Sequence, residues 1–358
     1  MSGGRIPHSS SQVLAEDFGY IAGLGDSNFV GAGRQSAALR DELRAFCGAV
    51  TVLLCDSGTD ALRLALLGLS RRYPDRTEVI ANAYVCPAVP SAICQLGLTP
   101  VFADCNPQDM GLAKEAVARL IGPKTLAIIC SHVGGIAEPV IEFAGFGVPV
   151  ISDAAQALGS SNASGQVAAQ GIMSVMSFGA TKVITGGSGG ALAIFDAELA
   201  ESIAPLAVEE LPVGRYLSDG FLPTWGQHFD DLRAGLVRAQ LTRLPAMLAA
   251  RRQIAATYDA ALESRSAARL LPEAATQGAN RFRYYVFVAD RDARLAQLHA
   301  AGIDARPSIA HDMCAYFRLD ERAFPNLGNN GRQLISLPIH LALDAAAITQ
   351  VAEQLTNW

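Results

Sequence analysis

The sequence predicts an α/β protein with two parts: a large domain built on a mostly parallel sheet covered by helices on both faces, and a smaller C-terminal α+β domain. Short, continuously apolar runs alternate with helical segments up to about residue 195, as in parallel sheets buried on both faces. After Asp196 the pattern becomes irregular and Pro-containing, and a long helical segment follows. The length of 358 residues also favours two domains over one.

The large domain is expected to contain alternating strands and helices. Strands are predicted at residues 49–55, 78–81, 99–104, 125–130, 149–152, 175–178 and 190–195. Helices are predicted at residues 39–46, 61–71, 88–96 and 112–120.

The C-terminal part has a different order of elements. A long helix is expected from about residue 230 to 263, with a bend at Pro245. Strands are then predicted at 283–288, 303–306 and 334–337, with helices at 292–301 and 344–355. We place the division inside the long helix, with a large domain at 1–240 that includes the N-terminal segment, and a small domain at 241–358.

Composition excludes several classes of function. The formal net charge is −6 and no run of like charges occurs, so nucleic acid is not an expected partner. No apolar stretch is long enough to span a bilayer, and residues 1–7 lack a signal core, so a cytoplasmic protein without membrane contact is expected. The seven cysteines form no CxxC pair and the six histidines show no ligand spacing, which predicts reduced thiols and no metal site.

Lys182 and Asp153 are the residues that indicate a chemistry. Asp153 closes a β-branched strand, and Lys182 lies between the strand at 175–178 and a glycine-rich turn at 186–190. Pyridoxal phosphate (PLP) needs such a pair: a lysine amine for a Schiff base, and a carboxylate that keeps the pyridine nitrogen protonated. Alone, the lysine would more often be a solvated surface residue and the aspartate a helix cap; their joint occurrence favours PLP.

The segment Ser57-Gly58-Thr59 predicts an anion site. It lies between a buried strand and a helix rich in alanine and leucine. The first N–H groups of a helix have no intrahelical partner, and the positive end of its dipole attracts anions. A simple helix cap is the alternative for this segment alone.

Four motifs in order carry a resemblance to a known family: Ser57-Gly58-Thr59-Asp60-Ala61-Leu62, the strand 99–104, Asp153-Ala154-Ala155-Gln156-Ala157, and the segment 177–182 that ends in Lys182. A fifth, Leu337-Pro338-Ile339-His340, closes the set. From about residue 6 to the C-terminus the chain resembles the DegT/StrS family of PLP-dependent sugar aminotransferases. That family has the aspartate aminotransferase fold, known as fold type I.

The resemblance implies a role for each motif. Lys182 would carry the Schiff base and move a proton between the substrate carbon and the cofactor. Asp153 would pair with the pyridine N–H, and Gln156 would lie near the ring and its phenolic oxygen. The phosphate would be held by the residues Ser57, Gly58, Thr59 and Ser177.

The chain departs from the family at three places. The ring-stacking aromatic position falls on Cys86, with Tyr84 two residues away. The family's Gly-Glu-Gly-Gly is replaced by a sequence with Ser188 in the place of the carboxylate. A partner-reaching Asn-aromatic-Arg corresponds to the segment 226–228, where Gln227 or His228 could substitute. The resemblance still implies a homodimer with shared active sites.

Substrate contacts are predicted for Ser188, His311 and Arg306. Arg306 and Arg283 could bind a donor carboxylate or a nucleotide phosphate through the guanidinium fork, or could form surface ion pairs. His311, with His132 and His340, is expected between the domains, where a packing histidine is the alternative.

The first hypothesis for function is an aminotransferase that moves an amino group from glutamate or glutamine to a keto-sugar, expected to be nucleotide-linked, in carbohydrate or specialised-metabolite biosynthesis. A second is a family member with altered PLP chemistry or a non-sugar substrate: elimination, carbon–carbon bond formation or another transamination. A third is a non-catalytic PLP-binding regulator, which no basic patch supports.

Overall fold

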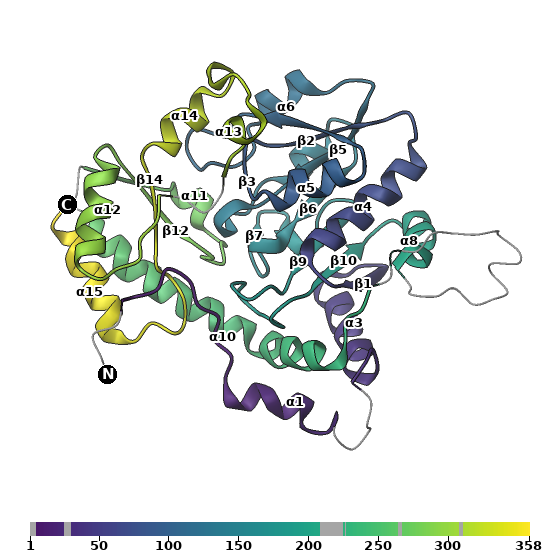
Figure 1. Ribbon diagram of the computed structural model, residues 1–358, viewed down its shortest axis with the longest axis horizontal. Coiled ribbons are helices and arrows are strands. Elements are labelled where there is room, and N and C mark those ends of the chain that lie inside the picture. Colours follow the sequence, from purple (N-terminus) through teal and green to yellow (C-terminus); the bar gives the residue numbers. More distant parts are fainter. Residues whose placement is uncertain (1–4, 25–29, 208–224, 226, 264–266, 308–310) are drawn as a thin grey trace, which may run out of the picture.

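The computed structural model describes residues 5–24, 30–207, 225, 227–263, 267–307 and 311–358 (Figure 1). Its centre is a seven-stranded sheet in the order β1-β10-β9-β6-β5-β2-β4. All pairs from β9 to β4 are parallel, and β10 is antiparallel to both of its neighbours. The strands are β1 (Thr51–Cys55), β2 (Glu78–Asn82), β4 (Thr99–Ala103), β5 (Thr125–Cys130), β6 (Val150–Asp153), β9 (Met173–Ser177) and β10 (Gly190–Ile194). The predicted α/β class with a mostly parallel sheet is confirmed.

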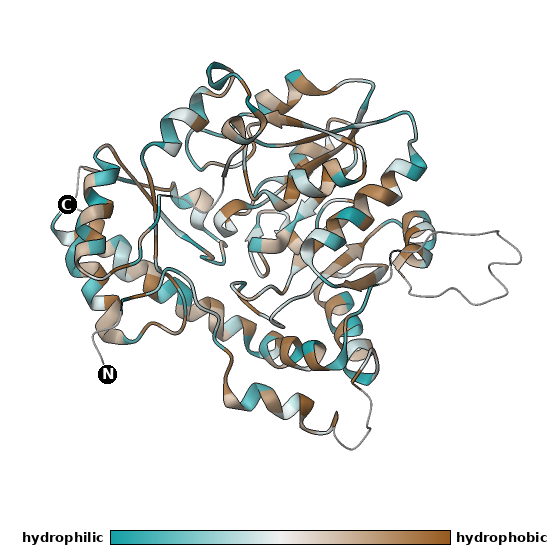
Figure 2. Cartoon of the chain, viewed as in Figure 1, coloured by the Kyte–Doolittle hydropathy of each residue, from teal (hydrophilic) through white to brown (hydrophobic). Residues whose placement is uncertain are grey.

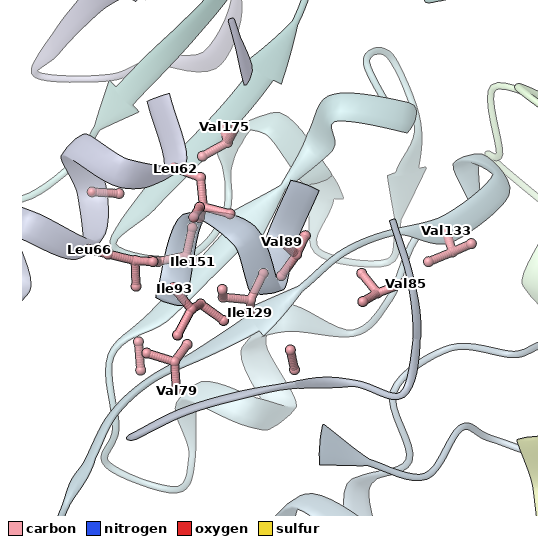
Figure 3. Packing of buried hydrophobic residues seen from close by; sticks show 14 of the residues in the cluster. Leu62, Leu66, Val79, Val85, Val89, Ile93, Ile129, Val133, Ile151 and Val175 are labelled. Atoms are coloured by element: carbon pink, nitrogen blue, oxygen red, sulfur yellow. The ribbon is translucent and has the colours of Figure 1, made fainter. Parts of the chain in front are cut away.

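Both faces of this sheet are covered. Val79 and Ala81 of β2 pack in one hydrophobic cluster and Ile80 in another, on the opposite face. Figure 3 shows Leu62 and Ile93, from two covering helices, beside strand residues of the first cluster. The first face carries α4 (Gly58–Arg72), α5 (Ala88–Gln95) and α8 (Ala197–Ile203); the other carries α3 (Arg34–Cys47), α6 (Lys114–Leu120) and α7 (Val140–Ala144).

The C-terminal part is a three-stranded antiparallel sheet with helices against it. Its strands are β11 (Ala268–Leu270), β12 (Tyr284–Val288) and β14 (Leu334–Leu337), and its helices are α12 (Arg291–Ala300) and α15 (Ala345–Thr356). Alternate residues of β12 face opposite ways: Tyr284 packs among the small-domain residues, whereas Tyr285 belongs to the core cluster of the large sheet. Strand β12 therefore contacts both parts of the protein, and it holds the residues directly before it next to the large sheet.

Helix α10 (Asp231–Leu262) connects the two parts and contains Pro245 (Figure 1). Its first half packs with α3 and its second half with α15. The division at 240/241 falls inside this continuous helix and stays a prediction. Near the N-terminus, the Ile6 N–H donates a hydrogen bond to the Gly302 carbonyl, and the Ile6 carbonyl accepts one from the Asp304 N–H. This segment therefore contacts the C-terminal part.

Some elements differ from the sequence expectation. Residues 303–306 form no strand. Instead, Ile303 forms an isolated β-bridge with Ile6 and Arg306 forms one with Ser336, because the chain turns between these contacts. The remaining short elements are α1 (Gly19–Ala22), β3 (Tyr84–Val85), β7 (Ser161–Asn162), β8 (Gly165–Gln166), α11 (Glu273–Thr276), β13 (His311–Asp312), α13 (Met313–Phe317) and α14 (Pro325–Gly331). Figure 2 shows hydrophobic and hydrophilic residues side by side around the covering helices. Among the helices in the described ranges, none has the length and hydrophobicity that crossing a bilayer requires.

Candidate active site

A cavity of about 240 Å³ opens at the carboxyl ends of β5, β6 and β9, beside the start of α4. Ligands of open parallel sheets bind at this edge. All eight residues predicted to hold the cofactor line this cavity: Ser57, Gly58, Thr59, Cys86, Asp153, Gln156, Ser177 and Lys182. The fold thus gathers side chains separated by up to 125 residues, and their roles remain predictions until a ligand is bound.

The start of α4 presents backbone N–H groups of the kind that bind anions. The Ser57 hydroxyl accepts a hydrogen bond from the Asp60 N–H at 3.1 Å, which fixes the N-terminus of this helix. The N–H groups of Gly58 and Thr59 precede the first intrahelical bond, so they have no partner from the helix itself. A Cβ on Gly58 would lie 2.9 Å from the Cβ of Ser177, so glycine lets the helix begin against β9. Gly58, Thr59 and Ser177 all line the cavity, so this edge has backbone N–H groups and hydroxyls of the kind that a phosphate dianion requires.

Asp153 is the last residue of β6 and lines the cavity. It is buried, and its Oδ1 accepts a hydrogen bond from the Ala155 N–H at 3.1 Å. Burial raises its pKa to about 6, while the Ala155 N–H and the charge of Lys182 act in the opposite direction. The carboxylate is therefore still mostly ionised at neutral pH and can accept a cationic N–H donor.

Lys182 follows β9 by five residues and is half-buried. Burial lowers its pKa, and the charge of Arg283 adds to this effect; Asp153 and Cys86 raise the pKa. Its Nζ lies 5.5 Å from the centroid of the Phe282 ring. A lysine with a lowered pKa loses its proton more readily and so becomes a better nucleophile.

Gln156 and Ser131 supply further polar atoms. The Gln156 Oε1 accepts the N–H of Gly134 at 2.9 Å, which orients the amide and leaves its NH₂ group as a donor. Sequence reasoning missed Ser131, whose buried Oγ lines the cavity and has no hydrogen-bond partner in the described part of the protein. The signal was available: Ser131 follows β5 directly, as Asp153 ends the neighbouring β6.

Cys86, and not Tyr84, lines the cavity. The Tyr84 side chain is buried in the hydrophobic core. Cys86 thus lies at the cavity with a small side chain, and its assignment to the place of the aromatic ring-stacking residue stays a prediction.

Two of the three predicted substrate residues, Ser188 and Arg306, lie away from the cavity. Ser188 is exposed, and its hydroxyl donates to the Asp56 carbonyl at 2.8 Å. Arg306 is exposed and pairs with Asp304 at 3.0 Å. Neither lines the cavity. The backbone of His311 pairs with Val85, a lining residue, but its side chain lies outside the described structure.

His132 and His340 have packing roles. The His132 Nδ1 accepts the N–H of Glu138, so its Nε2 carries the proton and donates to the Ser152 hydroxyl at 2.8 Å. Burial lowers the pKa of His132 to about 3, which keeps the ring neutral. The His340 Nε2 lies 2.9 Å from the Pro7 carbonyl and donates to it.

In the partner-reaching segment, Gln227 accepts the Asp56 N–H within its own chain, and Gly226 lies outside the described residues. The substitution of Gln227 or His228 for the family's asparagine stays a prediction. No group of three or more metal-ligating side chains is found in the described part of the chain.

Comparisons with known proteins agree with this fold. Residues 12–356 match the DegT/DnrJ/EryC1/StrS aminotransferase family. The GDP-perosamine synthase of Caulobacter vibrioides is 28% identical over 98% of this chain and 97% of its own. The dTDP-4-dehydro-2,3,6-trideoxy-D-glucose 4-aminotransferase of Saccharopolyspora spinosa is 30% identical over 95% and 93%. The crystal structure of AtS13 from Actinomadura melliaura superposes with a TM-score of 0.90 at 27% identity, covering 100% of both chains.

The parallel sheet with a lysine and an aspartate at its carboxyl edge defines an enzyme of the fold type I class. The chain belongs to the DegT/DnrJ/EryC1/StrS aminotransferase family, a family of PLP-dependent enzymes. The two relatives are named as a synthase of GDP-perosamine and as an aminotransferase of a dTDP-linked sugar.

The residues present fit the cofactor of this family. The unpartnered Ser131 hydroxyl and the first N–H groups of α4 are polar groups that a phosphorylated ligand would satisfy.

Proposed function

We propose that this aminotransferase binds PLP in the cavity at the carboxyl edge of its sheet. The observation that carries the proposal is the convergence of Lys182, Asp153 and the start of α4 on one cavity. Gly58 and Thr59 would bind the phosphate through their N–H groups, with the Ser177 hydroxyl, while the Gln156 amide would donate to the phenolic oxygen.

When bound, PLP would form a Schiff base with Lys182 and supply an electron sink for the substrate carbanion. Asp153 would hold the proton of the pyridine nitrogen, which its buried carboxylate can do because it is mostly ionised at neutral pH. The Lys182 Nζ would move the proton at the substrate carbon. Its lowered pKa favours the neutral amine that removes this proton.

The acceptor is a keto-sugar attached to a nucleotide, and the amino donor is glutamate or glutamine. The names of the two relatives support the acceptor, since they describe GDP- and dTDP-linked sugars. We further propose that the protein works as a cytoplasmic homodimer with shared active sites. Analytical ultracentrifugation with and without PLP would test the dimer.

An absorption spectrum tests the cofactor and the reaction together. The protein with added PLP is expected to show the Schiff-base band, which L-glutamate or L-glutamine bleaches to the amine form of the cofactor. The Lys182→Ala variant should show no such band, because it lacks the amine. Absence of the band in the wild type would overturn the assignment of Lys182.

Cys86 in the cavity favours testing one alternative, altered PLP chemistry or a non-sugar substrate, because the ring-stacking position of the family is changed. A Schiff-base band that no amino donor bleaches would support this alternative if products of elimination or carbon–carbon bond formation appear. A Schiff-base band that does not respond to amino acids, in a protein that forms no product, would indicate a PLP-binding regulator.

A further inference from the structure

Arg283 is a buried cation without an acidic partner. Arg283 is only 7% exposed and lies directly before β12. One guanidinium nitrogen, Nη1, lies 3.4 Å from the carbonyl of the adjacent Phe282, and Nε has no partner in the described part of the chain. No ion pair joins Arg283 to any carboxylate of the described residues. Buried arginines are normally paired, so this one indicates a missing anion.

The positive charge of Arg283 persists at neutral pH. Burial lowers its pKa to about 10, with Arg306 adding to the effect and Tyr285 opposing it. An arginine with this pKa remains protonated at pH 7, so the protein cannot relieve the buried charge by losing a proton. A ligand anion is the remaining source of a counter-charge.

The position of Arg283 ties it to the Lys182 cavity. Its guanidinium lies 4.0 Å from the centroid of the Phe282 ring, the same ring that Lys182 Nζ approaches to 5.5 Å. Its backbone N–H donates to the Gly134 carbonyl, and the Gly134 N–H donates to Gln156, a cavity residue. Arg283 does not itself line the cavity, but these hydrogen bonds hold its backbone next to a residue that does, on the small-domain side.

Other arginines near this segment have different environments. Arg251 is also buried, but its Nη1 donates to the carbonyls of Arg281 and Ile339, where it supports the backbone. Arg306 is half exposed and already paired with Asp304. The Nε of Arg251 also lacks a partner among the described residues, so Arg283 differs from Arg251 by its place beside the cavity and from Arg306 by its burial.

We propose that Arg283 binds the α-carboxylate of the amino donor. This inference rests on the proposed function and names how that site takes its first substrate. A carboxylate attached to the reacting carbon must lie close to Lys182, which acts on that carbon. The phosphates of a nucleotide-linked sugar are separated from the keto carbon by atoms of the sugar ring. The planar guanidinium fork matches a carboxylate with two parallel hydrogen bonds.

The donor half-reaction without any sugar tests this proposal. PLP-loaded wild type, Arg283→Met and Arg283→Lys are mixed with L-glutamate or with its α-amide, and bleaching of the Schiff-base band is followed. Arg283→Met is expected to lower the apparent second-order rate constant for L-glutamate about 100-fold. The rate constant for the α-amide should change little, because only L-glutamate has a free α-carboxylate. Arg283→Lys, with a charge but no fork, should fall between. Arg306→Met is the matched control and should behave as wild type.

Two results would overturn the assignment while leaving the proposed function standing. The first is a wild type that reacts with L-glutamate together with an Arg283→Met variant that keeps the wild-type preference for L-glutamate over the α-amide. If Arg283→Met does not fold, an unchanged preference in Arg283→Lys decides in the same way. The second is an unchanged pH midpoint of the Schiff-base band in Arg283→Met. Removal of a nearby positive charge should raise that midpoint. A wild type that never bleaches would instead reject the proposed function.

Discussion

Gly190, the first residue of β10, lies directly against the backbone of Ser57. A Cβ at Gly190 would come within 2.4 Å of the Ser57 carbonyl carbon and 2.5 Å of the Gly58 nitrogen. Real Cβ atoms do not approach backbone atoms so closely, so any larger residue must displace the turn. Because this turn presents the N–H groups at the start of α4, the packing of β10 sets the geometry of the proposed phosphate site.

Gly190→Ala is therefore expected to weaken PLP binding although residue 190 lines no part of the cavity. Overpacking against backbone typically costs about 1–3 kcal/mol, which predicts lower stability and a PLP affinity about 10-fold weaker. Fluorescence titration with PLP and urea unfolding measure the two effects. Gly122→Ala is the control, because a Cβ there meets nothing within 4 Å. Wild-type PLP affinity in Gly190→Ala would contradict the geometric argument.

Asp153→Asn tests the buried carboxylate without changing the shape of the side chain. The amide cannot hold the ring nitrogen as a cation, so turnover should fall by about 100-fold or more. The Schiff-base band should still form, because Lys182 is intact. Steady-state kinetics beside the absorption spectrum separates the two effects, and a variant with undiminished kcat would remove Asp153 from its proposed role.

Much of this site could be predicted from sequence because its residues follow strands of one parallel sheet. Asp153 and Lys182 are placed by short, strongly apolar strands whose carboxyl ends must share an edge. Ser57, Gly58 and Thr59 begin a helix whose N-terminus necessarily has free N–H groups.

The contribution of the small domain was harder to predict. Arg283 and Arg306 look alike in sequence, and only tertiary packing buries the first and leaves the second paired at the surface. The single bridges that replace a strand at 303–306 likewise depend on Ile6 and Ser336, which are distant in sequence. Local patterns do not contain such long-range contacts.

Cys86→Phe should return an aromatic ring to the cavity. Stacking between aromatic systems is worth about 0.5–1.5 kcal/mol beyond burial, so PLP should bind about 2- to 10-fold more tightly. The same ring would occupy space that the cysteine leaves open, and the KM for the keto acceptor should rise. Cys94→Phe, at an exposed position, is the matched control. Weaker PLP binding in Cys86→Phe would show that the side chain at 86 does not face the ring.

Glu138 gives the fold a pH dependence of defined sign. Its carboxyl group is buried, and neither oxygen has a hydrogen-bond partner in the described structure. Burial first, and then the charge of Asp109, raises its pKa from 4.5 to about 8. Between these values the folded protein keeps a proton that the unfolded chain loses, so the free energy of unfolding decreases as pH rises from about 4.5 to 8.

Glu138→Gln keeps the shape and removes the titration, so it should flatten this part of the stability profile. The difference in the free energy of unfolding between the wild type and the variant should change by about 2–4 kcal/mol between these pH values. Urea unfolding at several pH values measures it. His132 and His8, whose pKa values burial lowers to about 3, act with the opposite sign below pH 6.5. Both histidines are present in both proteins, so the difference isolates Glu138. Parallel stability profiles would mean that Glu138 ionises normally in the folded protein.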